Sequence, residues 1–250
     1  MQVVVDGLLT NYVRVGKGRV VVIVHGWGDN ATGWAELTKD LAKSFDVIVP
    51  DLPGFGGTQP PTSSWGLDDY AGFLKAFLEK IKISQVYCII GHSNGGAIAI
   101  RGLARNIITT QKLVLLSSAG VRGEHKGRLK GLSYAAKTGK FLTTPLPETT
   151  KNKLRNQAYK TIGSDMLLNE NLQETFKRIV IDDVQADARI INMPTLILYG
   201  ENDQQTPLRY GELFHELIDH STFEVITGAG HFTQLDRPGE VNSAVEAFIR

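Results

Sequence analysis

Short, nearly continuous apolar runs recur along the chain and alternate with segments of helix length. The runs are rich in Val, Ile and Leu, and they read "VVVIVHG" from Val20, "DVIVPD" from Asp46, "QVYCIIG" from Gln85, "KLVLLSS" from Lys112 and "PTLILYG" from Pro194. Strands that are buried on both faces have this composition, which is typical of a parallel sheet covered by helices. The pattern therefore predicts a central sheet whose strands are shielded from water.

The segments between these runs carry apolar residues every three to four positions, as amphipathic helices do. These segments are Trp34 to Lys43, Leu67 to Ile81 and Asn94 to Asn106. After the last of the apolar runs, the alternation of helix and strand continues with a helix over Leu208 to Asp219, a strand over Phe223 to Ile226 and a helix over Glu240 to Ile249. Strands that alternate with helices predict βαβ units with right-handed crossovers, and hence the α/β class. At the start, two apolar runs, Gln2 to Val5 and Leu8 to Val15, flank the turn-forming pair Asp6-Gly7 and predict a hairpin.

One long segment, residues 121–189, breaks this rhythm. It contains no strand-like run, only amphipathic stretches such as "KGRLKGLSYAAKTG" and "NLQETFKRIVIDD", broken by Pro145 and Pro147. We interpret it as a helical insertion between two strands of one sheet, so that residues 1–120 and 190–250 form one core domain. Its first part has a local excess of +8, from ten basic residues less two acidic ones: Arg122, Lys126, Arg128, Lys130, Lys137, Lys140, Lys151, Lys153, Arg155 and Lys160, against Glu124 and Glu148.

Composition and charge narrow the class of protein. The 250 residues are 42% hydrophobic, which suffices for a substantial core, and 27 basic residues are balanced by 26 acidic ones. This balance argues against nucleic acid or a membrane as the main partner. Cys88 is the only cysteine, so an internal disulfide is excluded, and no run approaches the roughly 20 apolar residues of a transmembrane helix. The sequence begins without a leader-like segment, and we expect a cytoplasmic protein.

Ser93 lies in "GHSNG", a G-x-S-x-G sequence that follows a predicted strand and precedes a predicted helix. Glycines on both sides allow the strand and the helix to meet at a sharp turn, which exposes the serine hydroxyl above the sheet on a strained backbone. A serine that acts only as the N-cap of a Gly-rich helix is the alternative interpretation. The context favours a nucleophile, which needs a base to remove its proton.

Of the six histidines, His231 fits the role of base best. It lies in "GAGHF", in the loop after the last predicted strand, and open α/β sheets build their sites in such loops. The other histidines are assigned to solvated surfaces (His125, His215 and His220), to packing beside the serine (His92) and to a strand end (His25).

A carboxylate normally orients the imidazole of a catalytic histidine. The loop "GENDQQTP" follows the predicted strand Thr195 to Tyr199 and offers two, Glu201 and Asp203. Glu201 lies closer to the strand end, where it can cap the turn, so Asp203 is the preferred candidate. The resulting order of serine, acid and histidine differs from the orders of the two serine-protease folds.

Attack of a serine on a carbonyl also requires donors for the oxyanion. The backbone N–H of Asn94, at the start of its helix, is one candidate, and the N–H of Trp27 in the loop "HGWGDN" is the other. Gly26 and Gly28 allow this loop to turn inward, so Gly26 and the side chain of Trp27 are also predicted to bind substrate. An ordinary loop in which Trp27 covers the core is the alternative.

Five segments together resemble the α/β-hydrolase superfamily over nearly the whole chain: "HGWG" at 25–28, "DLPGFGGT" at 51–58, "GHSNGG" at 91–96, "GENDQQTP" at 200–207 and "GAGH" at 228–231. The resemblance is to serine-nucleophile, carboxylesterase-like members with a helical cap. It implies the α/β-hydrolase fold: a mostly parallel central sheet, helices on both faces, and residues 121–189 as the cap. It also makes His25 structural. Ser93 argues against the dehalogenases and epoxide hydrolases of this fold, which use an aspartate nucleophile.

The sequence thus predicts a serine hydrolase that cleaves carboxylic esters of small or medium acyl substrates through an acyl-enzyme on Ser93. Neither a metal nor an organic cofactor is required, and neither nucleic acid nor membrane insertion is expected. Two alternatives stay open: a C–C bond hydrolase or perhydrolase with the same triad, and a receptor-like member that binds a ligand with little turnover. The basic cap is either a solvated surface or a site that attracts an anionic substrate or an acidic carrier protein.

Overall fold

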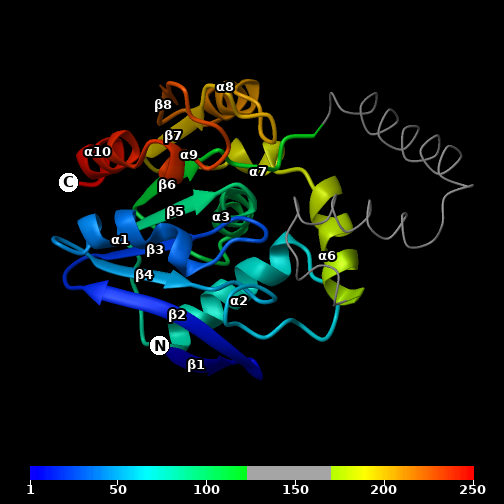
Figure 1. Cartoon of the computed structure of the whole chain (residues 1–250). Helices are drawn as coiled ribbons and strands as arrows, with labels where there is room; N and C mark the ends of the chain where they lie inside the picture. The colour runs from blue at the N-terminus through cyan, green and yellow to red at the C-terminus, as the bar shows by residue number, and fades with distance from the viewer. Residues whose placement is uncertain (123–169) are drawn as a thin grey trace, which may run out of the picture.

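A computed structural model of the chain describes residues 1–122 and 170–250, and residues 123–169 lie outside this description. The described parts contain an eight-stranded sheet (Figure 1). Its strands are β1 (Gln2–Val5), β2 (Leu8–Gly16), β3 (Val20–Val24), β4 (Asp46–Pro50), β5 (Cys88–His92), β6 (Lys112–Leu116), β7 (Thr195–Gly200) and β8 (Ser221–Ile226). They lie side by side in the order β1-β2-β4-β3-β5-β6-β7-β8, so β3 and β4 are exchanged relative to their order in the sequence.

The strand pairs from β4 to β8 are all parallel, and only β1-β2 and β2-β4 are antiparallel. The predicted hairpin joins β1 to β2 through Asp6 and Gly7, whose φ angles are 46° and 83°. Two successive positive φ angles form the mirror-image turn that matches the twist of paired strands. The predicted α/β-hydrolase fold with a mostly parallel sheet is therefore confirmed.

Helices cover both faces of the sheet, as Figure 1 shows. One face is covered by α2 (Leu67–Lys80), α3 (Asn94–Ala104) and α8 (Arg209–Leu217), and the other by α1 (Ala35–Leu41) and α10 (Pro238–Ile249). The remaining described helices are a 3-10 turn, η1 (Ala31–Trp34), and α6 (Glu170–Ile181), α7 (Gln185–Ala188) and α9 (Thr233–Asp236). The single turns α7 and α9 were not predicted, because four residues are too few to show a helical period.

Alternate side chains of the central strands enter two separate cores. In β3, Val22 and Val24 pack with α2 and α3, whereas Val21 and Ile23 pack with α1 and α10. All four side chains are fully buried. Because both faces of the strand are covered, the sequence of the strand shows no polar alternation, which explains its continuous apolar run.

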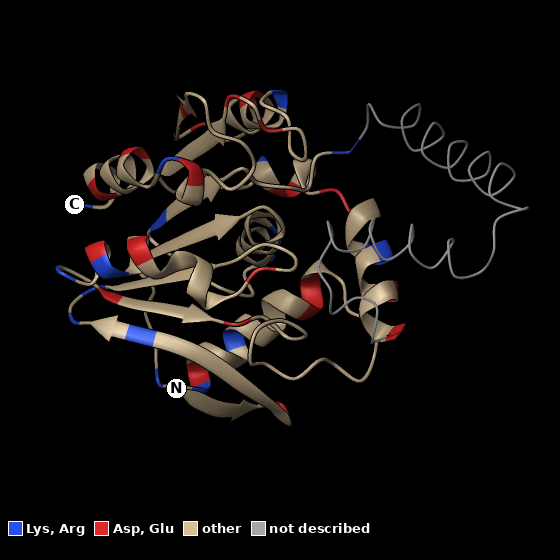
Figure 2. Cartoon of the chain, viewed as in Figure 1, with Lys and Arg blue, Asp and Glu red and all other residues tan. Residues whose placement is uncertain are grey.

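The predicted helical insertion, residues 121–189, lies mostly outside the described residues. Its described end contains α6, which is helical as the amphipathic pattern indicated, and the single turn α7, which the pattern did not predict. Of its basic residues named above, only Arg122 falls within the described ranges. Figure 2 shows few charged residues on the central strands and both signs of charge scattered over the surrounding helices. Within residues 1–122 and 170–250, no helix is both long and apolar enough to span a bilayer.

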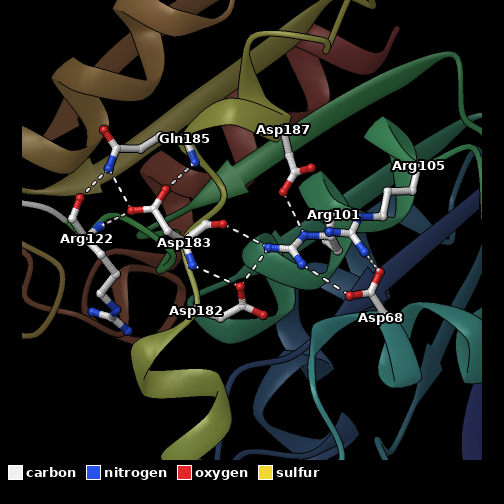
Figure 3. Close-up of polar contacts among 8 residues, drawn as sticks. All are labelled: Asp68, Arg101, Arg105, Arg122, Asp182, Asp183, Gln185 and Asp187. Atoms are coloured by element: carbon white, nitrogen blue, oxygen red, sulfur yellow. Dashed lines mark hydrogen bonds and ion pairs between the residues drawn. The ribbon is translucent and has the colours of Figure 1, made fainter.

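Arg101 of α3 ties the described end of the insertion to the core (Figure 3). Its side chain is only 7% exposed and donates to Asp68 at 3.2 Å, Asp182 at 2.8 Å, Asp187 at 2.7 Å and the carbonyl oxygen of Asp183 at 2.8 Å. Asp68 belongs to α2, and the other three belong to α7 or to the link between α6 and α7. Because an unpaired buried charge is costly, this arginine fixes how that link packs on α2 and α3.

Replacing Arg101 with Leu should lower the free energy of unfolding by about 3 kcal/mol, because the carboxylates lose their shared buried partner. Arg105→Leu is the matched control: the Arg105 side chain is 50% exposed and donates to Asp68, so a loss of about 1 kcal/mol or less is expected. Urea unfolding followed by circular dichroism measures both variants. Equal losses would contradict a structural role for the Arg101 contacts.

Candidate active site

Ser93 lies at the turn between β5, which ends at His92, and α3, which begins at Asn94. Its backbone has φ 50° and ψ −117°, a conformation that residues with a side chain rarely adopt. Such strain, of roughly 1–3 kcal/mol, persists only where the surroundings hold the residue in place. Here the N–H of Ser93 donates to the carbonyl oxygen of Leu116 at the end of β6, at 3.0 Å.

The glycines around Ser93 allow a contact between backbones that no side chain could enter. A Cβ atom on Gly91 would lie 2.7 Å from the Cα of Gly96, and one on Gly95 would lie 2.1 Å from the carbonyl oxygen of Val24. The first turn of α3 is therefore pressed against both β5 and the end of β3. This packing holds the serine in its strained conformation. The glycines of the G-x-S-x-G pattern are therefore needed for close backbone contact as well as for backbone flexibility.

The structure brings Ser93, His231 and Asp203 together in one hydrogen-bonded chain. The Nε2 atom of His231 lies 3.0 Å from the Oγ of Ser93, and its Nδ1 lies 2.9 Å from the Oδ2 of Asp203. The side chains of His231 and Asp203 are 7% and 0% exposed. The residues come from the turn after β5, the loop after β7 and the loop after β8, which meet at the carboxyl edge of the sheet.

Asp203 is buried yet remains ionised. Burial by itself opposes the charge, but hydrogen bonds from His231 and Thr206 outweigh it and hold the pKa of this carboxyl below its ordinary value. Its Oδ1 accepts the backbone N–H groups of Gln205 and Thr206 at 2.8 and 2.9 Å, and its Oδ2 accepts the Thr206 hydroxyl at 2.7 Å. The carboxylate can therefore orient the imidazole and stabilise its protonated form.

Glu201, the other carboxylate of this loop, points elsewhere. Its Oε2 accepts the backbone N–H of Gly228 at 2.9 Å, and its side chain is exposed. The turn-capping position expected for Glu201 is thus the one it occupies. Of the two candidates, only Asp203 contacts His231.

His92 and His25 are buried beside the site without reaching Ser93. The Nε2 of His92 lies 3.0 Å from the carbonyl oxygen of His231, and its ring packs 4.9 Å from the His231 ring. Burial lowers the pKa of His92 to about 3, so the ring is neutral and donates from Nε2. His25 accepts the N–H of Leu52 and donates to the carbonyl of Gly26. Packing of His92 was expected, but its hydrogen bond to the His231 backbone has no sequence signal.

A cavity of about 550 Å³ lies above the serine. Ser93 and His231 line it together with the other predicted site residues, Gly26, Trp27 and Asn94. Because α3 begins at Asn94, the N–H of this residue has no acceptor within its own helix. The roles of Trp27 and Asn94 as donors to an oxyanion stay predictions.

Much of the cavity wall was not identified from the sequence. The α6 residues Phe176, Ile179 and Val180 supply an apolar part, and the Phe176 ring packs 5.2 Å from that of Trp27. Their spacing on an amphipathic helix was visible, but the pattern does not say what an apolar face covers. Arg122 also lines the cavity. In residues 1–122 and 170–250, no three His, Cys, Asp or Glu side chains are grouped so that they could hold a metal ion.

Comparisons with known proteins agree with this architecture. A family model described as the Alpha/beta hydrolase family matches residues 21–244. The curated 2-hydroxy-6-oxo-2,4-heptadienoate hydrolase of Pseudomonas putida is 29% identical, over 94% of this chain and 90% of its own, and the 2-hydroxymuconate semialdehyde hydrolase of a Pseudomonas species is 26% identical, over 99% and 93%. A solved bacterial membrane phospholipase A superposes with a TM-score of 0.79 at 24% identity, covering 100% of this chain and 84% of that one.

Acid sensitivity of the fold should depend on His92. Between about pH 6.5 and 3 the unfolded chain binds a proton at this residue that the folded chain does not, so the free energy of unfolding falls as the pH falls. His92→Gln should therefore flatten the slope between pH 6 and 4.5 by about 1.4 kcal/mol per pH unit. Urea unfolding at a series of pH values measures this. His220→Gln, which changes an exposed histidine, is the control; an equal slope in wild type and His92→Gln would contradict the assignment.

Proposed function

The chain belongs to the alpha/beta hydrolase family, and on that premise we propose that it is a serine hydrolase that cleaves carboxylic esters of small or medium acyl substrates. The observation that carries the proposal is the hydrogen-bonded chain from the Oγ of Ser93 through His231 to Asp203, beside a cavity whose wall is partly apolar. A serine whose hydroxyl contacts a histidine that is itself held by a carboxylate is suited to attack a carbonyl.

The geometry supports acylation in the following way. His231 accepts the proton of Ser93 at Nε2, and the alkoxide attacks the ester carbonyl. Asp203, which stays ionised, stabilises the imidazolium that forms. Protonated His231 then gives its proton to the departing alcohol, which leaves an acyl-enzyme on Ser93 and a neutral imidazole.

Deacylation uses the same groups in reverse. His231 removes a proton from water, the hydroxide attacks the acyl carbonyl, and the proton returns to Ser93 as the acid leaves. In both steps the negative oxygen would be stabilised by the backbone N–H groups of Trp27 and Asn94, two residues that line the cavity together with Ser93. Loss of one such donor typically costs about 3–4 kcal/mol of barrier lowering.

Hydrolysis of a C–C bond is the second candidate, because two curated relatives are named as hydrolases of oxo-dienoate or semialdehyde compounds. The same serine, histidine and acid would attack a ketone carbonyl, and the leaving group would be a stabilised carbanion instead of an alkoxide. The two chemistries differ in how the leaving group is bound, which depends on the cavity wall. A direct comparison of substrates therefore decides between them.

Wild type should hydrolyse p-nitrophenyl esters, and Ser93→Ala should lower kcat/KM by at least about 1,000-fold, because the nucleophile is lost. The panel runs from acetyl to long acyl chains and includes 2-hydroxy-6-oxo-2,4-heptadienoate, whose cleavage is followed by its loss of absorbance. An ester as the best substrate supports the first candidate, and the dienoate as the best substrate supports the second. Labelling of Ser93 by a fluorophosphonate without turnover of any compound would favour a receptor-like protein.

Asp203→Asn should lower kcat by about 1,000- to 10,000-fold while leaving KM within a few-fold, because the amide no longer stabilises the imidazolium. Glu201→Gln is the matched control: the same change of charge, two residues away, on an exposed side chain whose oxygen accepts the N–H of Gly228. Steady-state kinetics on the best substrate measures both variants. Comparable losses in Glu201→Gln would remove Asp203 from its assigned role.

A further inference from the structure

The main chain at Arg122 is held on two sides, by the link between α6 and α7 and by the first residue of α7 (Figure 3). Its N–H donates to the Oδ2 of Asp183 at 2.7 Å, and its carbonyl oxygen accepts the side-chain amide of Gln185. Two residues earlier, the carbonyl oxygen of Gly120 accepts the N–H of Val184 at 2.9 Å. On the side of Gly120 and Arg122 these bonds involve only backbone atoms, so they fix the path of the chain where the insertion begins and leave the Arg122 side chain available.

The two arginines that meet this link are placed in opposite ways. The Arg101 guanidinium forms ion pairs with the carboxylates of Asp182 and Asp187, so its charge is neutralised. The acidic side chain of Asp183 binds the Arg122 backbone instead of the Arg122 guanidinium. In Figure 3 that guanidinium points away from Asp183 and Gln185.

Arg122 lines the same cavity as Ser93 and His231. Its Nε atom is buried and has no hydrogen-bond partner among the described residues. Burial lowers the pKa of the guanidinium from its ordinary value, which reflects a charge removed from water without full compensation. A cation in that condition is stabilised when an anion arrives.

The other described residues that line the cavity include no Asp, Glu, Lys or Arg. Arg122 is therefore the single formal charge in this part of the wall, which it shares with apolar side chains such as those of Phe176 and Ile179. A guanidinium presents a planar fork of donors that fits the two oxygens of a carboxylate.

We propose that Arg122 binds a carboxylate of the substrate, so that the preferred substrate is an anion whose carboxylate lies at a fixed distance from the carbonyl that Ser93 attacks. The inference rests on the proposed function and adds a substrate class to it. The many basic residues of the insertion suggested only a general electrostatic attraction of anions, whereas this proposal assigns the preference for an anion to one residue of the cavity.

The test compares substrates that differ by one methyl group. Monomethyl and dimethyl esters of succinate, glutarate and adipate are matched in shape, but only the monoesters carry a carboxylate at neutral pH. Hydrolysis is followed as base uptake at constant pH, and the readout is the ratio of kcat/KM for the monoester to that for the diester. If the first panel favours C–C cleavage, the pair is a dienoate and its methyl ester, and the ratio is defined in the same way.

Wild type should favour the monoester at one chain length by about 10-fold or more, and Arg122→Gln should lower that ratio by about 10- to 100-fold, mainly through KM, as loss of a charged hydrogen bond does. Arg122→Lys should keep part of the preference because it keeps the charge. Arg189→Gln, an identical change of charge on an exposed residue at the end of α7, should leave the ratio within twofold of wild type.

The outcomes separate the two proposals. Turnover of both esters with no anion preference, or an unchanged ratio in Arg122→Gln, overturns the role of Arg122 and leaves the hydrolase intact. If Arg189→Gln lowers the ratio as much as Arg122→Gln does, the anion preference comes from long-range attraction and not from a carboxylate bound at Arg122, which also overturns the role of Arg122. No turnover of either member of any pair removes the proposed function and the inference with it. Because the backbone bonds of residue 122 survive every substitution used, thermal midpoints near that of wild type are expected for these variants.

Discussion

The backbone contact between the start of α3 and the strands β3 and β5 is the constraint on which the site depends. Gly91, Gly95 and Gly96 bring these elements closer than any Cβ atom would permit, and Ser93 takes a positive φ as a result. The serine hydroxyl then lies at the carboxyl edge of the sheet, where the loops after β7 and β8 begin. Because β5 to β8 are neighbouring parallel strands, residues more than a hundred positions apart in the sequence reach one another there.

Three buried histidines around this edge differ in what their ring nitrogens contact. His231 bridges Ser93 and the ionised Asp203, which is the arrangement that the proposed proton transfer requires. His92 donates to the backbone of His231, and His25 accepts from the backbone of Leu52. Burial keeps both of these rings neutral. The groups around each ring, more than its position in the sequence, distinguish His231 as the candidate base from His92 and His25, which have structural contacts.

The link between α6 and α7 connects the site to the core through two arginines (Figure 3). Arg101 is held by carboxylates from α2, from this link and from α7, which ties the described end of the insertion to the layer of helices beside β5. On the other side, Asp183 and Gln185 hold the backbone at Arg122. The same short segment therefore positions both the apolar wall contributed by α6 and a side chain that brings a formal charge into the cavity.

The sequence by itself determined the strands, the hairpin, the sharp turn at Ser93 and the short set of candidates for its partners. These features follow from local rules: apolar runs for strands buried on both faces, a turn-forming pair at Asp6-Gly7, and glycines on either side of the serine. The sequence favoured Asp203 over Glu201, but that Asp203 and not Glu201 meets His231 is visible only in the tertiary structure, as are the hydrogen bond from His92 and the place of Arg122 in the cavity. Two carboxylates in one loop satisfy the same local pattern, and which of them meets His231 depends on how the ends of β7 and β8 lie in space. Sequence periodicity reports which face of an element is buried, whereas the pairing of distant polar side chains is fixed when the elements pack.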